Sequence, residues 1–181
     1  MNAMETIHII PGKLTLEQIR KINSQPVLIE LDPACTQKIE ESVNTVQKVI
    51  DQGRTIYGIN TGFGLLANKI IPDNELTELQ HSIVLSHAAG VGKMMSDATV
   101  RLIMVLKVNS LARGYSGIRR EVIDAIIQLI NTQVYPCIPE KGSVGASGDL
   151  APLAHMSTVL LGEGAVTCKG QILSGREGLE K

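Results

Sequence analysis

Aromatic side chains are scarce in this chain of 181 residues, which has no tryptophan, one phenylalanine and three tyrosines. Hydrophobic residues still make up 44% of the sequence, and a chain of this length can bury a sizeable core. That core must therefore be built from aliphatic side chains. No apolar run is long enough to cross a bilayer, so we expect one folded domain over residues 1–181 and no membrane partner.

An excess of charge of either sign is also lacking, since the net charge at pH 7 is −1. Composition therefore gives no reason to expect nucleic acid or an anionic membrane as partner. The three cysteines, Cys35, Cys137 and Cys168, form an odd set without metal-ligand spacing, so we expect buried free thiols and no metal. Because no signal peptide is recognisable either, we expect a reducing, cytoplasmic setting.

The most distinctive stretch is a glycine-rich run, GSVGASGDLAP at residues 142–152, which leads into an apolar run predicted to be helical over 150–161. Asp149 is a good N-cap, and Pro152 suits the first turn of a helix. Ser147 is therefore predicted to lie just before a helix N-terminus. Backbone N–H groups and the positive end of the helix dipole converge at such a position.

Common serine and glycine motifs do not fit this run. The nucleophile elbow G-x-S-x-G would need glycine in place of Asp149, and neither phosphate-binding glycine pattern occurs. Backbone chemistry fits better, because the unhindered Gly148 nitrogen can attack the Ala146 carbonyl and close a five-membered ring. Ring closure releases one water, and elimination of the Ser147 hydroxyl releases a second. The product carries an exocyclic methylidene, provided that the surrounding structure holds the loop bent.

Two further blocks stand out earlier in the chain. Residues 57–64 read YGINTGFG, in which three glycines favour a close backbone approach over a regular helix. Residues 86–92 read SHAAGVG and follow a helix predicted over 73–87. Taken alone, Tyr57 can be interpreted as a structural tyrosine tucked into a glycine turn. His87 can likewise be interpreted as a core histidine whose ring nitrogens are hydrogen-bonded. The small residues after His87, in contrast, leave room for a ligand.

With the three blocks in this order, the chain resembles the aromatic amino acid ammonia-lyases over essentially its whole length. The resemblance implies that Ala146, Ser147 and Gly148 cyclise autocatalytically to 4-methylidene-imidazol-5-one (MIO), with Asp149 in support. It also implies that Tyr57 is a catalytic tyrosine. To act as a base near neutral pH, a tyrosine needs positive charge or hydrogen bonds around its oxygen.

The resemblance further implies that Asn60 and Gly64 contribute to substrate binding. Ser86 and His87 match the pair of positions that selects the substrate in the resembled family. Histidine-deaminating members resemble this chain in carrying Ser-His there, whereas phenylalanine-deaminating members tend to carry apolar pairs and tyrosine-deaminating members a His-Leu pair. A polar pair can hydrogen-bond an imidazole and discriminate against rings that lack its partner atoms. The expected reaction is elimination of ammonia from L-histidine to give urocanate, the first step of histidine degradation. Whether the amine or the imidazole adds to MIO stays open.

The expected fold is mainly α, as in the N-terminal, MIO-bearing domain of the ammonia-lyases. Periodicity and capping signals predict helices over 16–23, 33–52, 73–87, 97–113, 119–131 and 150–161. Short strands are predicted at 7–10 and 27–31, and a hairpin over 165–174 turns at Lys169 and Gly170. A capping box with Ser174 and Glu177 predicts one more helix start.

Members of the resembled family are much longer, with a central helix bundle, a second catalytic tyrosine and a homotetrameric assembly. We therefore interpret this chain as an N-terminal fragment without that bundle, inactive alone, whose helices over 97–113 and 119–131 expose apolar faces. Two alternatives are an ammonia-lyase or aminomutase for another aromatic amino acid, and a truncated scaffold without catalytic function.

Overall fold

The computed structural model describes residues 4–61, 75–142 and 150–181. Helices dominate, and the strands are short, as expected. In chain order the elements are β1 (Glu5–Ile9), α1 (Leu16–Ser24), β2 (Val27–Leu31), the 3-10 helix η1 (Pro33–Cys35), α2 (Thr36–Asp51), α3 (Leu76–His87), β3 (Val91–Met94), α4 (Asp97–Leu111), α5 (Arg120–Asn131), β4 (Val134–Pro136), β5 (Pro139–Lys141), α6 (Leu150–Leu160), β6 (Ala165–Cys168), β7 (Gln171–Ser174) and α7 (Gly175–Leu179).

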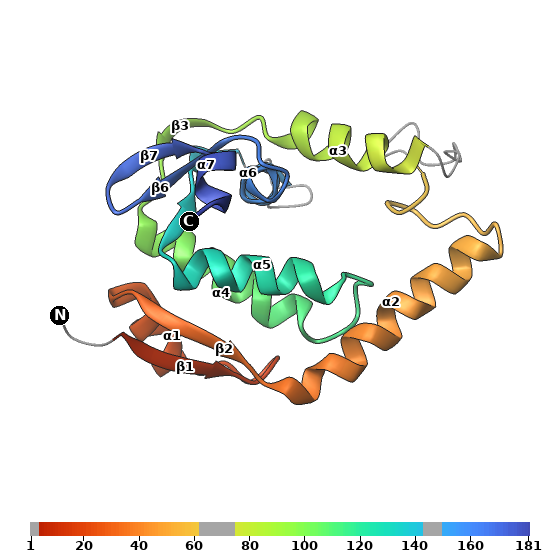
Figure 1. Ribbon diagram of the computed structural model, residues 1–181, viewed down its shortest axis with the longest axis horizontal. Coiled ribbons are helices and arrows are strands. Elements are labelled where there is room, and N and C mark those ends of the chain that lie inside the picture. The colour runs from red at the N-terminus through yellow and green to blue at the C-terminus, as the bar shows by residue number, and fades with distance from the viewer. Residues whose placement is uncertain (1–3, 62–74, 143–149) are drawn as a thin grey trace.

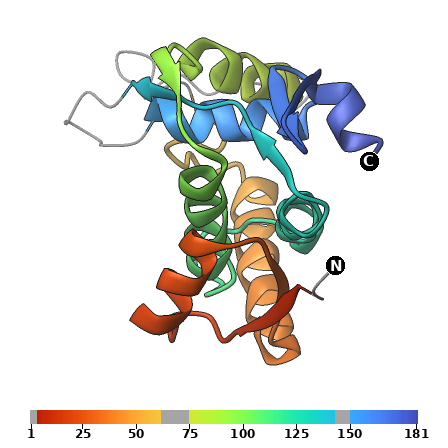
Figure 2. The same ribbon diagram turned by 90° about the vertical axis from the view of Figure 1, so that its left-hand side faces the viewer.

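The helices form layers (Figure 1). One outer layer holds α1, β1 and β2, the packed pair α4 and α5 runs through the middle, and the other outer layer holds α3, α6 and the β6–β7 hairpin. Helix α2 connects the two outer layers along one side, as the view turned by 90° also shows (Figure 2). Of the candidate site residues that the structure describes, Ser86 and His87 belong to α3 in the layer above α4 and α5, and Tyr57 and Asn60 lie in the segment between α2 and α3.

The strands form three small sheets. Strands β1 and β2 pair in parallel across the α1 connection, β3 pairs antiparallel with β5, and β4, β6 and β7 form an antiparallel sheet in the order β4-β6-β7. The predicted hairpin is confirmed: Lys169 and Gly170 both have positive φ, at 49° and 80°, as a two-residue turn of this hand requires. Strand β3 was not predicted, and it links the segment after His87 to the segment before Gly142.

The core is aliphatic, as the composition predicted. Helix α5 directs Ile123, Ile126, Leu129 and Ile130 inward, where they meet residues of β2, β4 and α4. The expectation that the helix over 119–131 exposes an apolar face is therefore wrong, because those elements already cover that face. The expectation for α4 holds only at Leu106, which is 41% exposed.

One residue of α4 departs from the expectation of a helix that is apolar nearly all round. Arg101 is buried, and its guanidinium donates hydrogen bonds to the backbone carbonyls of Ile22 at 2.6 Å and Asn23 at 3.2 Å. These carbonyls lie in the last turn of α1, where a positive charge is favourable. A charge inside the core thus fixes α1 against α4.

Candidate active site

The loop before residue 62 is held by its own polar side chains. Asn60 is buried; its Oδ1 accepts the Ile56 N–H at 2.7 Å, and its Nδ2 donates to the Arg54 carbonyl at 2.9 Å. Asn60 therefore shapes the loop. Tyr57, in contrast, is 62% exposed, so the alternative of a tyrosine tucked into the turn is wrong. Gly64 lies outside the described residues.

This loop is tied to the first half of α3. Gln80 donates from Nε2 to the Ile59 carbonyl at 3.1 Å, and the Gly58 N–H donates to Thr61 Oγ1 at 3.3 Å. The loop that carries Tyr57 thus approaches α3 some seven residues before the Ser86–His87 pair. At a rise of about 1.5 Å per residue, the two contacts lie about 10 Å apart along the helix.

Ser86 and His87 form the last turn of α3. Their side chains converge on one backbone carbonyl, that of Ile83, which lies 3.0 Å from Ser86 Oγ and 2.7 Å from His87 Nδ1. A carbonyl oxygen only accepts, so His87 donates from a protonated Nδ1 in this contact. His87 is half-buried at the helix end rather than in the core.

The small residues that follow His87 are packed tightly at one point. A Cβ added at Gly90 would lie 3.0 Å from His155 Nε2 on α6 and 3.3 Å from Pro139 Cβ on β5. The expectation that this segment leaves room for a ligand is therefore wrong at Gly90, where glycine permits close approach of two other elements. The next residues, Val91 to Met94, form β3 and pair with β5.

Ala146, Ser147, Gly148 and Asp149 lie outside the described residues, but both ends of their segment are described. A Cβ added at Gly142 would lie 2.8 Å from the Ala151 Cβ and 3.3 Å from Gly90 Cα (these three residues come from three separate parts of the chain). Gly142 and Ala151, which flank residues 143–149, are thus neighbours in space.

The residue types at positions 146–148, Ala, Ser and Gly, are those that ring closure to MIO needs, and the segment that contains them is flanked by two residues that lie close together. The same contact brings the segment after Ser86 and His87 to the base of the glycine-rich run. Two of the three sequence blocks therefore meet in space. The third, around Tyr57, contacts the opposite half of α3.

His155 is the residue at this junction that sequence reasoning missed. Its Nε2 accepts the Gly90 N–H at 3.0 Å, and burial lowers the pKa of the imidazole below its ordinary value of 6.5. The signal available in the sequence was its isolation, because it is the one histidine or charged residue in the apolar run of α6.

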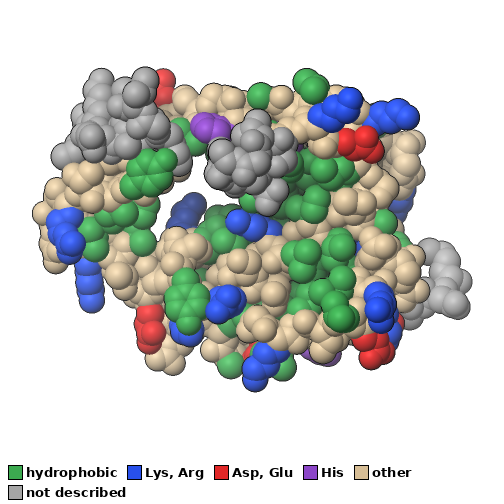
Figure 3. Space-filling model, turned by 180° about the vertical axis from the view of Figure 1, so that it is seen from behind, with side chains coloured by type: hydrophobic (Ala, Val, Ile, Leu, Met, Phe, Trp, Pro, Cys, Tyr) green, Lys and Arg blue, Asp and Glu red, His purple; other side chains and the backbone are tan. Residues whose placement is uncertain are grey.

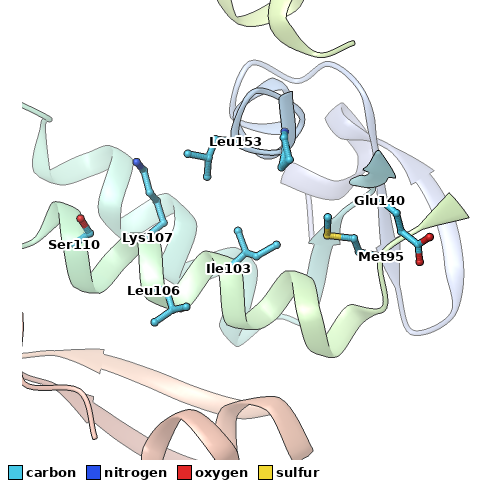
Figure 4. Close-up of a pocket in the computed structure, with 8 residues that line it drawn as sticks. Met95, Ile103, Leu106, Lys107, Ser110, Glu140 and Leu153 are labelled. Carbon is cyan, nitrogen blue, oxygen red and sulfur yellow. The ribbon is translucent and has the colours of Figure 1, made fainter. Parts of the chain in front are cut away.

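A pocket of about 410 Å³ lies between α4 and α6 (Figure 4). Its lining residues are Met95, Ile103, Leu106, Lys107, Ser110, Glu140, Pro152 and Leu153. None of the predicted site residues that the structure describes is among them. Lys107 extends from α4 toward α6 in this mostly apolar setting. Seen from behind, hydrophobic side chains gather around a hollow in the molecule (Figure 3).

Other kinds of site find little support in residues 4–61, 75–142 and 150–181. These residues contain no group of three or more His, Cys, Asp or Glu side chains that could hold a metal ion. None of the helices formed by these residues combines the length and apolar character needed to cross a membrane. All three cysteines are free; Cys35 is buried as expected, whereas Cys137 and Cys168 are half-buried.

Comparison with known proteins agrees with the geometry. The family model described as aromatic amino acid lyase matches residues 14–181. The histidine ammonia-lyase of Desulfotalea psychrophila is 67% identical over 96% of this chain and 34% of its own length, and that of Vibrio cholerae is 64% identical over 94% and 33%. The chain thus spans about a third of the length of these curated relatives.

Solved structures give the same result. Histidine ammonia-lyase from Trypanosoma cruzi matches with a TM-score of 0.87 at 31% identity, and the Pantoea agglomerans phenylalanine aminomutase with 0.86 at 35%; each match covers 97% of this chain and 34% of the other. The Treponema denticola ergothionase, at 23% identity and a TM-score of 0.93, shares the fold over 97% of this chain and 35% of its own. Because the family model covers nearly all residues, the chain belongs to the aromatic amino acid lyase family.

Proposed function

We propose that this chain is the cofactor-forming and substrate-selecting part of a histidine ammonia-lyase, which eliminates ammonia from L-histidine to give urocanate. The observation that carries the proposal is the contact among Gly90, Gly142 and Ala151. It brings the segment after Ser86 and His87 to the base of the run that contains the Ala-Ser-Gly tripeptide. The high identity to curated histidine ammonia-lyases supports histidine as the substrate.

The cofactor of this proposal is MIO, formed from Ala146, Ser147 and Gly148 without a metal. Once formed, it would supply an electrophilic methylidene carbon and an electron sink. Asp149 supports it as the predicted N-cap of α6, whose N-terminal dipole and backbone N–H groups favour negative charge nearby. The closeness of Gly142 and Ala151, which flank residues 143–149, supports this proposal.

The chain's own side chains would bind and orient the substrate. His87 at the last turn of α3, where its Nδ1 contacts the Ile83 carbonyl at 2.7 Å, would help to select the imidazole of the substrate by hydrogen bonding. Ser86 adds a hydroxyl at the same helix end. Exposed Tyr57 would remove the β-proton as base, while Asn60 holds its loop in shape and, with Gly64, contributes to substrate binding.

The complete active site needs more than these residues. Tyr57 and the base of residues 143–149 are held at opposite halves of α3, which supports a site that other segments or subunits complete. We therefore propose that the complete protein acts in the cytoplasm as a homotetramer whose central helix bundle lies beyond the matched third.

A chimera tests the proposed function. In it, this chain replaces the matched third of the Desulfotalea psychrophila enzyme, and urocanate and ammonia are measured with L-histidine, L-tyrosine and L-phenylalanine. We expect urocanate from histidine and little reaction with the other two substrates. Ser147→Ala should abolish the activity, and His87→Leu should shift the preference away from histidine.

The same experiment decides the alternatives. The solved tyrosine and phenylalanine aminomutases are 30–35% identical to this chain. Preferential reaction of the chimera with tyrosine or phenylalanine would favour the second candidate, an enzyme for another aromatic amino acid. A folded chimera with no reaction on any of the three substrates would favour a non-catalytic scaffold. Either result would contradict histidine ammonia-lyase activity.

A further inference from the structure

One side chain of α6, His155, hydrogen-bonds the backbone of the substrate-selecting segment, residues 86–90. We propose that His155 is a positioning residue, whose Nε2 accepts the Gly90 N–H and so fixes residues 86–90 against α6. The consequence for catalysis rests on the proposed function, whereas the contact itself can be tested without it.

The geometry of the contact is specific. The Gly90 nitrogen lies 3.0 Å from His155 Nε2, and because a backbone N–H only donates, this ring nitrogen must be unprotonated. The proton of the neutral ring is therefore on Nδ1. A Cβ at Gly90 would crowd both Nε2 and Cδ2 of the ring, at 3.0 and 3.2 Å, so no side chain larger than hydrogen fits without displacing the imidazole.

The position of His155 on α6 links this contact to the glycine-rich run. His155 lies four residues after Ala151, so the two side chains share one face of the helix. Ala151 is the residue that Gly142 approaches, and Gly90 lies beside Gly142 and His155. One face of α6 thus contacts both Gly142, which precedes residues 143–149, and Gly90 in the substrate-selecting segment.

The surroundings keep His155 in the form that accepts a hydrogen bond. Burial alone lowers the pKa of the imidazole, and no charged side chain of the described residues contributes to the shift. The titratable and charged groups on the elements packed against α6 are Glu78, His81 and His87 on α3, Arg120, Glu121 and Asp124 on α5, Tyr135 on β4, and Arg176 and Glu177 on α7. The ring is therefore neutral near pH 7.

Loss of the acceptor would loosen the segment without removing any group that touches substrate. Gly90 would lose the partner of its N–H, and the Ser86–His87 pair, three and four residues earlier, would no longer be held at a fixed distance from α6. We expect weaker and less selective substrate binding, with a smaller effect on the chemical step.

Hydrogen exchange of the Gly90 amide tests the contact in the 181-residue chain. His155→Leu keeps much of the bulk but removes the acceptor, and we expect Gly90 exchange to rise roughly tenfold. His155→Gln places an amide oxygen near the position of Nε2, so exchange should stay within about threefold of the unsubstituted chain. Unchanged exchange in His155→Leu would overturn the proposal.

A second measurement needs no substitution and applies even if the leucine variant fails to fold. In the unsubstituted chain, protonation of Nε2 removes the acceptor, so Gly90 protection, corrected for the intrinsic pH dependence of exchange, should fall as the pH drops below 6.5. In His155→Gln the protection should not change over this range. Protection that is independent of pH in the unsubstituted chain would overturn the proposal.

Kinetics of the chimera separate positioning from packing. His155→Leu should raise the KM for histidine roughly tenfold with kcat within about threefold, and His155→Gln should restore KM. Equal damage by both variants would indicate a merely structural role and contradict the proposal. If the chimera makes no urocanate while Gly90 exchange responds as expected, the proposed function fails and the contact stands.

Discussion

Helices α3 and α5 both span 12 residues, yet they are held in the molecule in opposite ways. Helix α5 buries four aliphatic side chains between α4, β2 and β4. Helix α3, which ends in Ser86 and His87, has no buried side chain among those that the structure describes. Its apolar residues Ile83 and Val84 are only half-buried.

This difference separates the stable part of the fold from the part that carries the candidate site. The position of α5 follows from non-directional burial of apolar area. The position of α3 depends instead on its packing against α6 and on directional contacts, such as Gln80 with the Ile59 carbonyl and, just beyond its end, Gly90 with His155. Segments with few buried contacts open at low local free energy, so we expect α3 to be the more dynamic helix.

The largest expected effect comes from a matched pair of truncations. Ile126→Ala in α5 should lower the free energy of unfolding by about 2–5 kcal/mol, because Ile126 is 2% exposed and a cavity would remain. Ile83→Ala in α3 should cost about 1 kcal/mol or less, since that side chain is half-buried. Urea unfolding followed by circular dichroism measures both. Equal costs would contradict the contrast between the helices.

A smaller and more local effect is expected from Asn60→Ala in the Tyr57 loop. The substitution leaves the Ile56 N–H and the Arg54 carbonyl without their partner, which costs about 1–3 kcal/mol. Hydrogen exchange should rise in residues 54–61 while the urea midpoint changes little. Asn44→Ala on the exposed face of α2 is the control and should alter neither. A full loss of global stability in Asn60→Ala would show that this loop belongs to the main folding unit.

Helix α3 can also be strengthened. Its N-cap, Glu75, makes no side-chain capping bond, and Glu78 already occupies the third helical position. The backbone at Glu75 is helical, with φ −103° and ψ −6°, so Glu75→Ser completes a capping box when residue 75 takes the extended conformation of an N-cap; we then expect α3 to gain about 1 kcal/mol, seen as slower hydrogen exchange in its first turns. Glu75→Ala is the matched control without a capping oxygen. The same exchange in both variants would mean that tertiary contacts alone fix the start of α3.

The smallest expected effect is a pH dependence on the α3 side of the molecule. Burial holds the pKa of His155 below 6.5 in the folded state, so the unfolded chain takes up this proton first as the pH falls. Stability from this group is complete above about pH 6.5 and is lost between 6.5 and the lowered pKa. Unfolding free energies measured from pH 8 to 5 should fall more steeply for the unsubstituted chain than for His155→Gln. Identical pH slopes of the unfolding free energy in the two proteins would contradict a contribution of buried His155 to the pH dependence of stability.

Much of the fold could be predicted because its signals are local. The cap at Thr15, the strand over 27–31 and the turn at Lys169 and Gly170 depend on neighbouring residues, and the structure has all three. Strand β3 gave no such signal. All four of its residues are exposed, so no buried face gives its sequence an alternating pattern, and its partner β5 lies far along the chain.

The residues of the candidate site also divide into those that local sequence predicts and those that depend on distant contacts. The motifs around Tyr57, Ser86 and Ser147 could be named from the sequence because each is a short block. The role of His155 could not be predicted, because its partner Gly90 is 65 residues away and an apolar helix with one histidine has many possible surroundings. Buried Arg101 was missed for the same reason, since its acceptors belong to α1.

The mass of one tryptic peptide tests the central claim most directly. Trypsin should release residues 142–169, which contain the Ala146-Ser147-Gly148 tripeptide between Lys141 and the bond after Lys169. Because the base of this segment is closed by contacts within the chain, we predict a mass lower than the sequence mass by two water molecules. Ser147→Ala should abolish MIO formation and retain the mass of its unmodified sequence. The full sequence mass in the unsubstituted chain would contradict the account.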